Sequence, residues 1–297
     1  MARFRFAVID LGSNTFHLLI SDLDSKSQSF TEVFRKRSFV YLSRDGVQQL
    51  SYKAIQRALA SLKLLGSLCK AYEVDEIHVF GTAVFRQAKN SKIIQDAVQS
   101  YLDCNLRILS GEEEANYILE GISWTLSDKT KPYLIMDIGG GSVEYILVTD
   151  SDLLACSLNH GISVLRNNWN RKDPPTSDEI ERLDSQLEGD FKELDIYKSN
   201  EPQILVGSSG PFEILESILG APILAKKDVI SLIEQILSKD LQQRLEIDKM
   251  PQSRADLSIE SIALVNFILK RFTSINSIRI SPYGIKEGII RERLNLG

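Results

Sequence analysis

The sequence predicts an α/β protein built from two similar halves. Short apolar runs typical of strands alternate along the chain with longer segments that have the apolar spacing of helices. An acid followed by a turn of small residues stands between apolar strands twice, at Asp10 and at Asp137. The chain has 297 residues, which is long enough for two domains.

The first half opens with strand, tight turn and strand over residues 4–24. Residues 74–88 predict a strand that ends at Gly81, followed by a loop and a helix. Residues 104–110 predict another strand. The predicted helices of this half are 51–72, 91–103 and 111–126.

The second half starts after a predicted linker at 127–132, with a strand–glycine–strand unit from Tyr133. Residues 171–183 predict a loop and a helix capped by Ser177 or Asp178. Residues 202–215 predict a strand, a glycine loop and a helix. Long helices follow, and residues 277–294 predict a strand, a turn and a final helix.

Composition narrows the class of protein. The net charge of -5 and the pI near 5.4 disfavour nucleic acid as a partner. No apolar run reaches the roughly 20 residues of a membrane helix, and the N-terminus enters a strand at once, so neither a membrane partner nor a signal peptide is expected. The few, scattered cysteines predict a reducing, cytoplasmic location without disulfides, and the three histidines form no pattern of a zinc site. The oligomeric state, including a homodimer, is left open.

The two acid-and-turn segments align residue by residue. Asp137 falls on Asp10, and the turn 139–142 falls on the turn 12–15. Successive backbone N–H groups in such turns form anion-binding nests, to which serine and threonine hydroxyls add donors. Together with a third loop at 207–210, they predict these phosphate-binding residues: Gly12, Ser13, Asn14, Thr15, Gly139, Gly140, Gly141, Ser142, Gly207, Ser208 and Ser209.

Carboxylates beside a phosphate indicate a divalent cation. They cannot bind phosphate directly, whereas Mg²⁺ takes carboxylates and phosphate oxygens together. Other charged groups have plainer interpretations when taken alone. Glu112, Glu113 and Glu114 suit the start of a helix, where they interact favourably with its dipole. Arg86 and the cluster Arg35–Arg37 suit exposed positions.

Seven motifs occur in the same order as in the exopolyphosphatase/guanosine pentaphosphate phosphohydrolase (Ppx/GppA) family, which this chain resembles over essentially its whole length. They are DLGSNTFHLLI, GTAVFRQA, SGEEEA, DIGGGSVE, GSSG, RAD and YGIKEG. The resemblance implies two ribonuclease-H-like domains of the actin-like ATPase type that flank a phosphate-binding cleft. The expected first domain is 1–128 with a C-terminal helix at about 284–297, and the second is 129–283. The implied reaction is removal of the terminal phosphate of inorganic polyphosphate, guanosine pentaphosphate or both, with Mg²⁺ or Mn²⁺ and water.

The resemblance also assigns roles to individual residues. Glu114, directly before the alanine of SGEEEA, matches the general base of the family. Asp137 and Glu144 match acids implicated in metal binding and in positioning water, and Asp10 matches the acid of the first phosphate motif. Arg86 matches an arginine that faces the phosphates. The expected catalytic set is therefore Glu114, Asp137, Glu144 and Arg86, and the expected metal ligands are Asp10, Asp137 and Glu144. Pro211 after GSSG departs from the family pattern, so contact of that loop with a nucleoside is left open.

Two alternatives differ in chemistry. A sugar or acetate kinase of the same superfamily would need a clear adenosine loop and a substrate aspartate in place of Glu114. A non-catalytic nucleotide or polyphosphate sensor would have no need of the acids and Arg86. Longer members of the family carry a further helical region after this length, so we expect short polyphosphate or guanosine pentaphosphate as good substrates, with early release of long chains.

Overall fold

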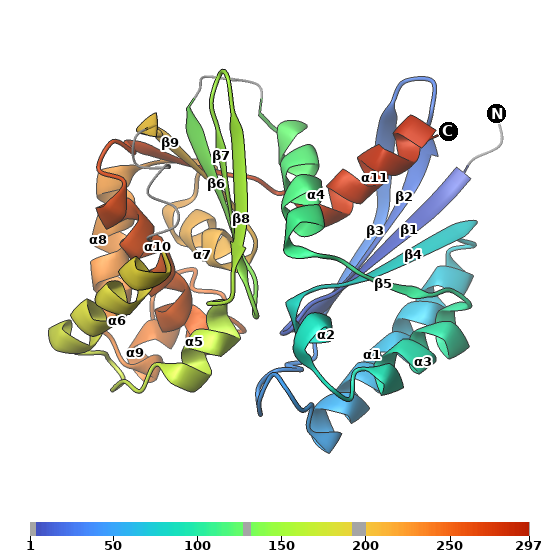
Figure 1. Cartoon of the computed structure of the whole chain (residues 1–297), viewed down its shortest axis with the longest axis horizontal. Helices are drawn as coiled ribbons and strands as arrows, with labels where there is room; N and C mark the ends of the chain where they lie inside the picture. Colours follow the sequence, from blue (N-terminus) through green and yellow to red (C-terminus); the bar gives the residue numbers. More distant parts are fainter. Residues whose placement is uncertain (1–3, 127–131, 192–199, 297) are drawn as a thin grey trace. The chain divides into compact units, whose positions relative to one another are not determined.

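The computed structural model describes residues 4–126, 132–191 and 200–296. They form two compact α/β units, which Figure 1 shows with both sheets and their helices. The first unit contains the residues up to Trp124, the turn Gly139–Ser142 and the residues from Tyr283 onward. The second contains Thr125–Ile138 and Val143–Pro282. The chain therefore leaves the first unit and returns to it with its last helix.

A five-stranded sheet with the order β3-β2-β1-β4-β5 organises the first unit. Its strands are β1 (Phe4–Leu11), β2 (Thr15–Asp24), β3 (Ser29–Phe39), β4 (Glu76–Gly81) and β5 (Leu106–Ile108). β1, β2 and β3 form an antiparallel meander, whereas β4 pairs parallel with β1 and β5 pairs parallel with β4. The carboxyl ends of β1, β4 and β5 therefore meet at one edge of the sheet, where loops that bind ligands commonly lie.

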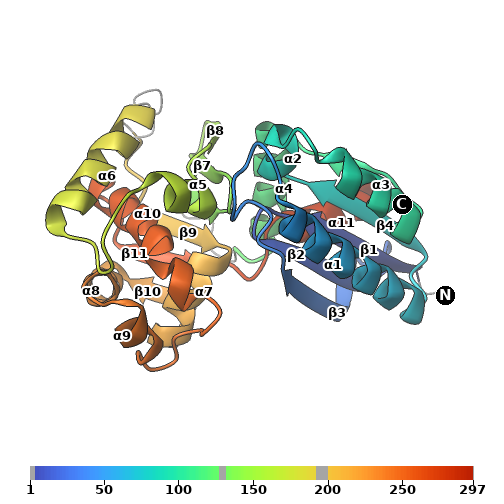
Figure 2. The ribbon, with the colours of Figure 1, turned by 90° about the horizontal axis from the view of Figure 1, so that it is seen from below.

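Helices cover both faces of this sheet. They are α1 (Tyr52–Ala71), α2 (Ala83–Gln87), α3 (Lys92–Leu102), α4 (Gly111–Ser123) and α11 (Ile285–Leu296). α1 and α3 lie side by side (Figures 1 and 2) and share a core with Ala7, Ile9 and Leu11 of β1. Because side chains alternate along a strand, Asp10 projects from the opposite face, together with the buried Phe6.

The contact between α4 and α11 depends on two glycines. A Cβ atom on Gly121 would lie 2.0 Å from the carbonyl oxygen of Gly284. A Cβ atom on Gly288 would lie 1.9 Å from the carbonyl oxygen of Tyr117. The two helix backbones touch here, so only glycine fits at either position.

A six-stranded sheet with the order β10-β11-β9-β6-β7-β8 organises the second unit. Its strands are β6 (Tyr133–Ile138), β7 (Val143–Val148), β8 (Leu153–Leu158), β9 (Ile204–Ser208), β10 (Ile223–Ala225) and β11 (Ser277–Ile280). β6, β7 and β8 form an antiparallel meander, β9 pairs parallel with β6, and β11 pairs parallel with β9. The short β10 adds an antiparallel strand at the edge.

Helices pack on one face of this sheet. They are α5 (Ile162–Asn168), α6 (Ser177–Asp190), α7 (Gly210–Leu219), α8 (Lys226–Leu237), α9 (Leu241–Leu245), the 3-10 helix η2 (Ala255–Leu257) and α10 (Ser258–Arg271). Leu134, Met136 and Ile138 of β6 belong to the core that these helices form. By the alternation of side chains, Asp137 projects from the other face.

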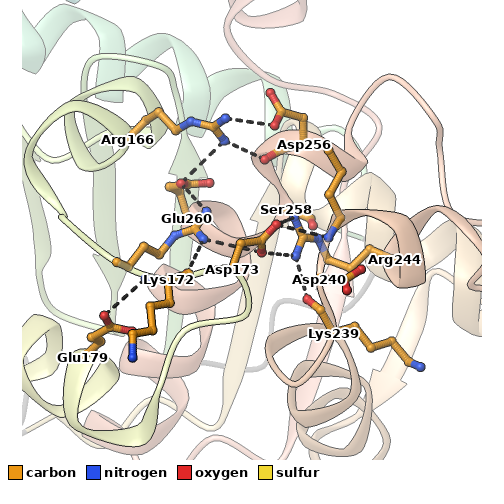
Figure 3. A network of polar contacts seen from close by, with 12 residues as sticks. Arg166, Lys172, Asp173, Glu179, Lys239, Asp240, Arg244, Asp256, Ser258 and Glu260 are labelled. Atoms are coloured by element: carbon orange, nitrogen blue, oxygen red, sulfur yellow. Dashed lines mark hydrogen bonds and ion pairs between the residues drawn. The ribbon is translucent and has the colours of Figure 1, made fainter.

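A network of ion pairs joins the helices of the second unit (Figure 3). Glu260 of α10 is 1% exposed and accepts from Arg171 at 2.7 Å. Arg244 of α9 is equally buried, and its Nη1 donates to Asp173 at 2.6 Å. Removal of Asp173 would leave the buried Arg244 guanidinium without its counter-charge, a loss that typically costs about 3–5 kcal/mol. The buried charged residues of this network therefore have a role in holding the helical layer together.

The internal duplication predicted from the sequence is confirmed. Three antiparallel strands followed by two parallel ones give the order β3-β2-β1-β4-β5 in the first unit and β8-β7-β6-β9-β11 in the second. Each first hairpin is closed in the same way, because the N–H of Gly12 donates to the carbonyl oxygen of Thr15 at 3.0 Å and that of Gly139 to Ser142 at 2.9 Å. The predicted α/β class is also confirmed.

The predicted division between residues 128 and 129 lies outside the described residues, and the compact units change over between Trp124 and Thr125. The predicted cap at Ser177 or Asp178 is wrong. Thr176 is the N-cap of α6, since its side chain accepts from the N–H of Glu179 while the Glu179 side chain returns to the Thr176 N–H. Ser177 and Asp178 are the first residues of the helix itself.

Among the residues that the structure describes, none of the helices has the length and apolarity that crossing a membrane requires.

Candidate active site

The three adjacent glutamates at the start of α4 have three different environments. Glu112 is exposed. Glu113 forms a capping box with Ser110 and an ion pair with Arg107 at 2.7 Å. The N–H of Ser110 and then the Arg107 guanidinium lower the pKa of Glu113 below its ordinary value. These two acids therefore account for the plain interpretation of the cluster, as the charged start of a helix.

Glu114 differs from its neighbours because it is buried. It is 7% exposed, and its Oε2 lies 2.9 Å from Nη1 of Arg86, which also donates to the carbonyl oxygen of Leu109 at 2.7 Å. Arg86 comes from α2, just after β4, and Leu109 follows β5. The parallel strands β4 and β5 thus bring a glutamate and an arginine that are far apart in sequence into contact. A charge-assisted hydrogen bond of this kind fixes the carboxylate at a defined place.

The first glycine turn, residues 12–15, is held by backbone hydrogen bonds to the segment that follows β3. The carbonyl oxygen of Asn14 accepts from the N–H groups of Val40 and Tyr41, both at 2.9 Å. The Thr15 hydroxyl lies 2.7 Å from Nε2 of His17. The Ser13 hydroxyl is buried and has no hydrogen-bond partner among the described residues. A buried hydroxyl is normally hydrogen-bonded, so a ligand or water atom at Ser13 would satisfy it.

The second turn, Gly139–Ser142, belongs to the same compact unit as the first. A Cβ atom on Gly140 would lie 2.8 Å from Cβ of Ser13 and 2.9 Å from Nδ2 of Asn14. Glycine is thus required here by close packing inside the unit. This is a different reason from the approach of a ligand that the sequence predicted, and binding of phosphate by the turn stays a prediction.

Asp137 and Glu144 lie directly opposite each other on β6 and β7. Opposed residues of antiparallel strands project to the same face and have Cβ atoms about 4.5–5.5 Å apart. Ser208 of β9 stands beside Asp137 in the same register. Glu144 is 1% exposed, and Asp137 is half-buried. The hairpin therefore brings the two predicted acids together, although six residues separate them in sequence.

This pair of acids fits a Mg²⁺ ion. Mg²⁺ is commonly held by one or two carboxylates, with waters and substrate oxygens completing its coordination. Within the part of the chain that the structure describes, no three His, Cys, Asp or Glu side chains gather as a metal site. The fit consequently rests on Asp137 and Glu144, and the addition of Asp10 from the first unit stays a prediction.

The third glycine loop, residues 207–210, joins β9 to α7. The Ser209 hydroxyl lies 3.0 Å from both the N and the O atom of Ile138, which ties the loop to β6. Ser209 has φ 75° and ψ -175°, a region that residues other than glycine rarely adopt and that costs roughly 1–3 kcal/mol. The Ser208 hydroxyl is buried without a hydrogen-bond partner among the described residues. Ser208, rather than Ser209, therefore has a hydroxyl available for a ligand.

Arg254 is a residue of this loop region to which the sequence assigned no role. A Cβ atom on Gly210 would lie 1.7 Å from Nη1 of Arg254, and Nη2 of Arg254 pairs with Glu213 at 2.6 Å. A guanidinium group thus lies against the backbone at the start of α7. The RAD motif marks Arg254 in the sequence. Because this motif lies far from GSSG along the chain, the sequence did not predict the contact between Arg254 and Gly210.

Comparisons with known proteins agree with this architecture. A crystal structure of an exopolyphosphatase from Cytophaga hutchinsonii has a TM-score of 0.90 and 28% identity, with 98% of each chain covered. The Ppx/GppA family member of Aquifex aeolicus has a TM-score of 0.80 and 20% identity, with 99% of each chain covered. A Haemophilus influenzae protein named, provisionally, as an exopolyphosphatase is 25% identical over 291 residues, which cover 96% of this chain and 90% of that protein. The fold is thus that of two-domain α/β phosphatases.

The chain belongs to the Ppx/GppA phosphatase family, whose model matches residues 20–296. The family assignment made from the sequence motifs is therefore confirmed.

Proposed function

We propose that this protein is a Mg²⁺-dependent hydrolase that releases the terminal phosphate from inorganic polyphosphate, from guanosine pentaphosphate, or from both. The observation that carries the proposal is the buried Glu114 carboxylate held 2.9 Å from Arg86. Hydrolysis of a phosphoanhydride requires a positioned water, a group that accepts its proton, and positive charge near the phosphoryl oxygens. The pair supplies a base and a cation at one place.

Glu114 acts as the general base in this proposal. It orients the attacking water and accepts its proton, a contribution worth about 10²–10⁴-fold in rate. Arg86 is fixed by the carbonyl oxygen of Leu109 as well as by Glu114, so its guanidinium holds the carboxylate in place and lends positive charge to the incoming phosphate. The exposed Glu112 and the capping Glu113 take no part.

Phosphate is held by backbone and hydroxyl donors. The N–H groups of Gly12 and Gly139 close the two hairpins, and the later N–H groups of the turns 12–15 and 139–142 would face the phosphate. Ser13 and Ser208 offer hydroxyls that have no protein partner among the described residues. Arg254 at Gly210 adds charge beside the third loop. Asp137 and Glu144 would hold the Mg²⁺, which, when bound, neutralises charge on the phosphate oxygens.

A relative supports polyphosphate as a substrate. The structurally similar Cytophaga hutchinsonii protein, with 28% identity, is an exopolyphosphatase. This supports polyphosphate for the present chain, and guanosine pentaphosphate is the second substrate implied by the sequence motifs.

The deciding experiment measures phosphate release from each substrate, with and without Mg²⁺. Release in the presence of Mg²⁺ and its loss in Glu114→Gln are the expected results. Tight binding of polyphosphate without release would instead identify a sensor. Consumption of ATP only when an acceptor such as acetate or a sugar is present would identify a kinase.

A further inference from the structure

Ser157 on β8 continues the row formed by the two acids. The register of the meander pairs Asp137 with Glu144 and Glu144 with Ser157. All three side chains therefore project from the same face, opposite the helical core.

The hydroxyl of Ser157 donates to Oε1 of Glu144 at 2.7 Å. That distance is typical of a short, charge-assisted bond between a hydroxyl and a carboxylate. Glu144 is 1% exposed, and burial of a carboxylate is costly unless hydrogen bonds satisfy it. Glutamate also has three rotatable side-chain bonds, so a partner is needed to hold its oxygens at one place. Ser157 is half-buried and supplies such a partner from the neighbouring strand.

We propose that Ser157 is a positioning residue that orients Glu144 for a divalent cation. The inference rests on the proposed function, in which Asp137 and Glu144 hold Mg²⁺. Groups that hydrogen-bond to metal ligands fix their orientation, and their loss typically weakens metal binding or activity by about 10–100-fold. Ser157 would not contact the substrate, and it acts only through Glu144.

The test measures binding of Mn²⁺ by electron paramagnetic resonance in the absence of substrate, and kcat and KM for polyphosphate. Ser157→Ala should weaken Mn²⁺ binding by about 10-fold and lower kcat/KM by a similar factor. Ser157→Thr keeps the hydroxyl and should stay within about threefold of the wild type on the same scale. A role in folding alone would not give this rescue together with a change in metal affinity.

Thr149→Ala is the matched control. It removes a hydroxyl from the same hairpin, where Thr149 bonds the backbone of Asp152 rather than Glu144. Its melting temperature should fall without a change in Mn²⁺ affinity. If the wild type hydrolyses its substrate and Ser157→Ala binds Mn²⁺ as tightly as the wild type does, the inference is overturned and the proposed function stands. Weaker Mn²⁺ binding by Ser157→Ala, with no hydrolysis by the wild type, would support the inference and reject the function. A wild type that binds no Mn²⁺ would overturn the inference.

Discussion

Arg86 and Glu114 form an ion pair in which a single guanidinium nitrogen, Nη1, serves both the carboxylate and a backbone carbonyl. Nη1 lies 2.9 Å from Oε2 of Glu114 and 2.7 Å from the carbonyl oxygen of Leu109. The arginine is therefore fixed by the segment after β5, and the glutamate is fixed by the arginine. A candidate base that is already oriented in the protein alone has little freedom to lose when substrate arrives.

Replacement of Glu114, the proposed general base, should lower turnover without weakening substrate binding. Glu114→Gln should lower kcat by roughly 10²-fold or more with little change in KM, because proton acceptance occurs only in the transition state. Glu112→Gln is the control, since Glu112 is exposed and adjacent in sequence. Small and equal effects of the two changes on kcat would reject the assignment of Glu114.

Arginine and lysine should not be equivalent at position 86. Lysine keeps the charge but lacks the planar fork, so Arg86→Lys cannot reproduce the same geometry at Glu114 and Leu109. We expect kcat to fall by about 10-fold or more, since small errors in the placement of a catalytic group are costly. Arg107→Lys, which changes the partner of Glu113, should leave kcat close to that of the wild type. Full activity of Arg86→Lys would show that charge alone suffices.

Removal of divalent cations should abolish hydrolysis. Dialysis against a chelator should eliminate phosphate release, and added Mg²⁺ or Mn²⁺ should restore it. Asp137→Asn should prevent that restoration while circular dichroism shows a folded protein, because an amide is a poorer ligand than a carboxylate for a hard cation. Activity that persists in excess chelator would disprove the proposed role of Asp137 and Glu144.

The glycines between α4 and α11 should be sensitive to a single methyl group. Gly288→Ala should lower the free energy of unfolding by about 1–3 kcal/mol or more, because the added Cβ would overlap the carbonyl oxygen of Tyr117. Gly189→Ala in α6 is the control, since its Cβ would meet no atom of the described residues within 4 Å. That change should leave stability unchanged or raise it by up to about 1 kcal/mol. Denaturant unfolding of both variants measures the contrast.

A buried histidine predicts a loss of stability in mild acid. Burial lowers the pKa of His160 to about 4 from an ordinary value of 6.5. Its Nε2 lies 3.1 Å from the Tyr145 hydroxyl, and Oδ2 of the exposed Asp190 lies 3.9 Å from Nδ1, too far to offset burial. The folded state thus holds neutral His160 at a pH where the unfolded state already binds a proton.

The sign of the effect follows from that difference. The free energy of unfolding is not reduced by His160 above pH 6.5. As the pH falls toward 4, protonation of His160 in the unfolded state lowers this free energy, by about 2 kcal/mol at pH 5. Unfolding in urea at pH 7 and pH 5 should show a smaller loss for His160→Gln than for the wild type. Equal losses in the two proteins would show that His160 is not the group responsible.

The duplicated architecture could be predicted from the sequence because the same short pattern, an acid followed by a turn of small residues, occurs in both halves of the chain. Asp10 and Asp137 each end an apolar strand before a small-residue turn, and the structure closes both turns with the same hydrogen bond. Helical spacing could not distinguish Glu114 from Glu112, however, since the difference depends on which face of α4 is covered. The family motif singles out Glu114, and the tertiary contact with Arg86 shows the physical difference between the two glutamates.

Ser157 shows why part of the site could not be predicted. The hydrogen bond between Ser157 and Glu144 depends on the register of the β7–β8 hairpin, whose loop length cannot be read from the sequence. A shift of the register by one residue would turn the Ser157 side chain to the other face of the sheet. The prediction of the N-cap of α6 was wrong for a related reason, because several neighbouring residues fit the same pattern. Thr176, Ser177 and Asp178 are all good capping residues, and the reciprocal bond with Glu179 selects the first of them.

The packing of α11 on α4 has a consequence for biosynthesis. The ribosome completes every segment of the second unit before it makes α11, so the second unit can fold while the first still lacks its last helix. At about 5–20 residues per second, roughly ten to thirty seconds pass between translation of α4 and of α11. During that interval the nascent sheet exposes the face that carries Phe6 and Val8, both fully buried in the finished protein. Protection of this face by a chaperone would matter most in that window, which closes when the glycines of the two helices meet.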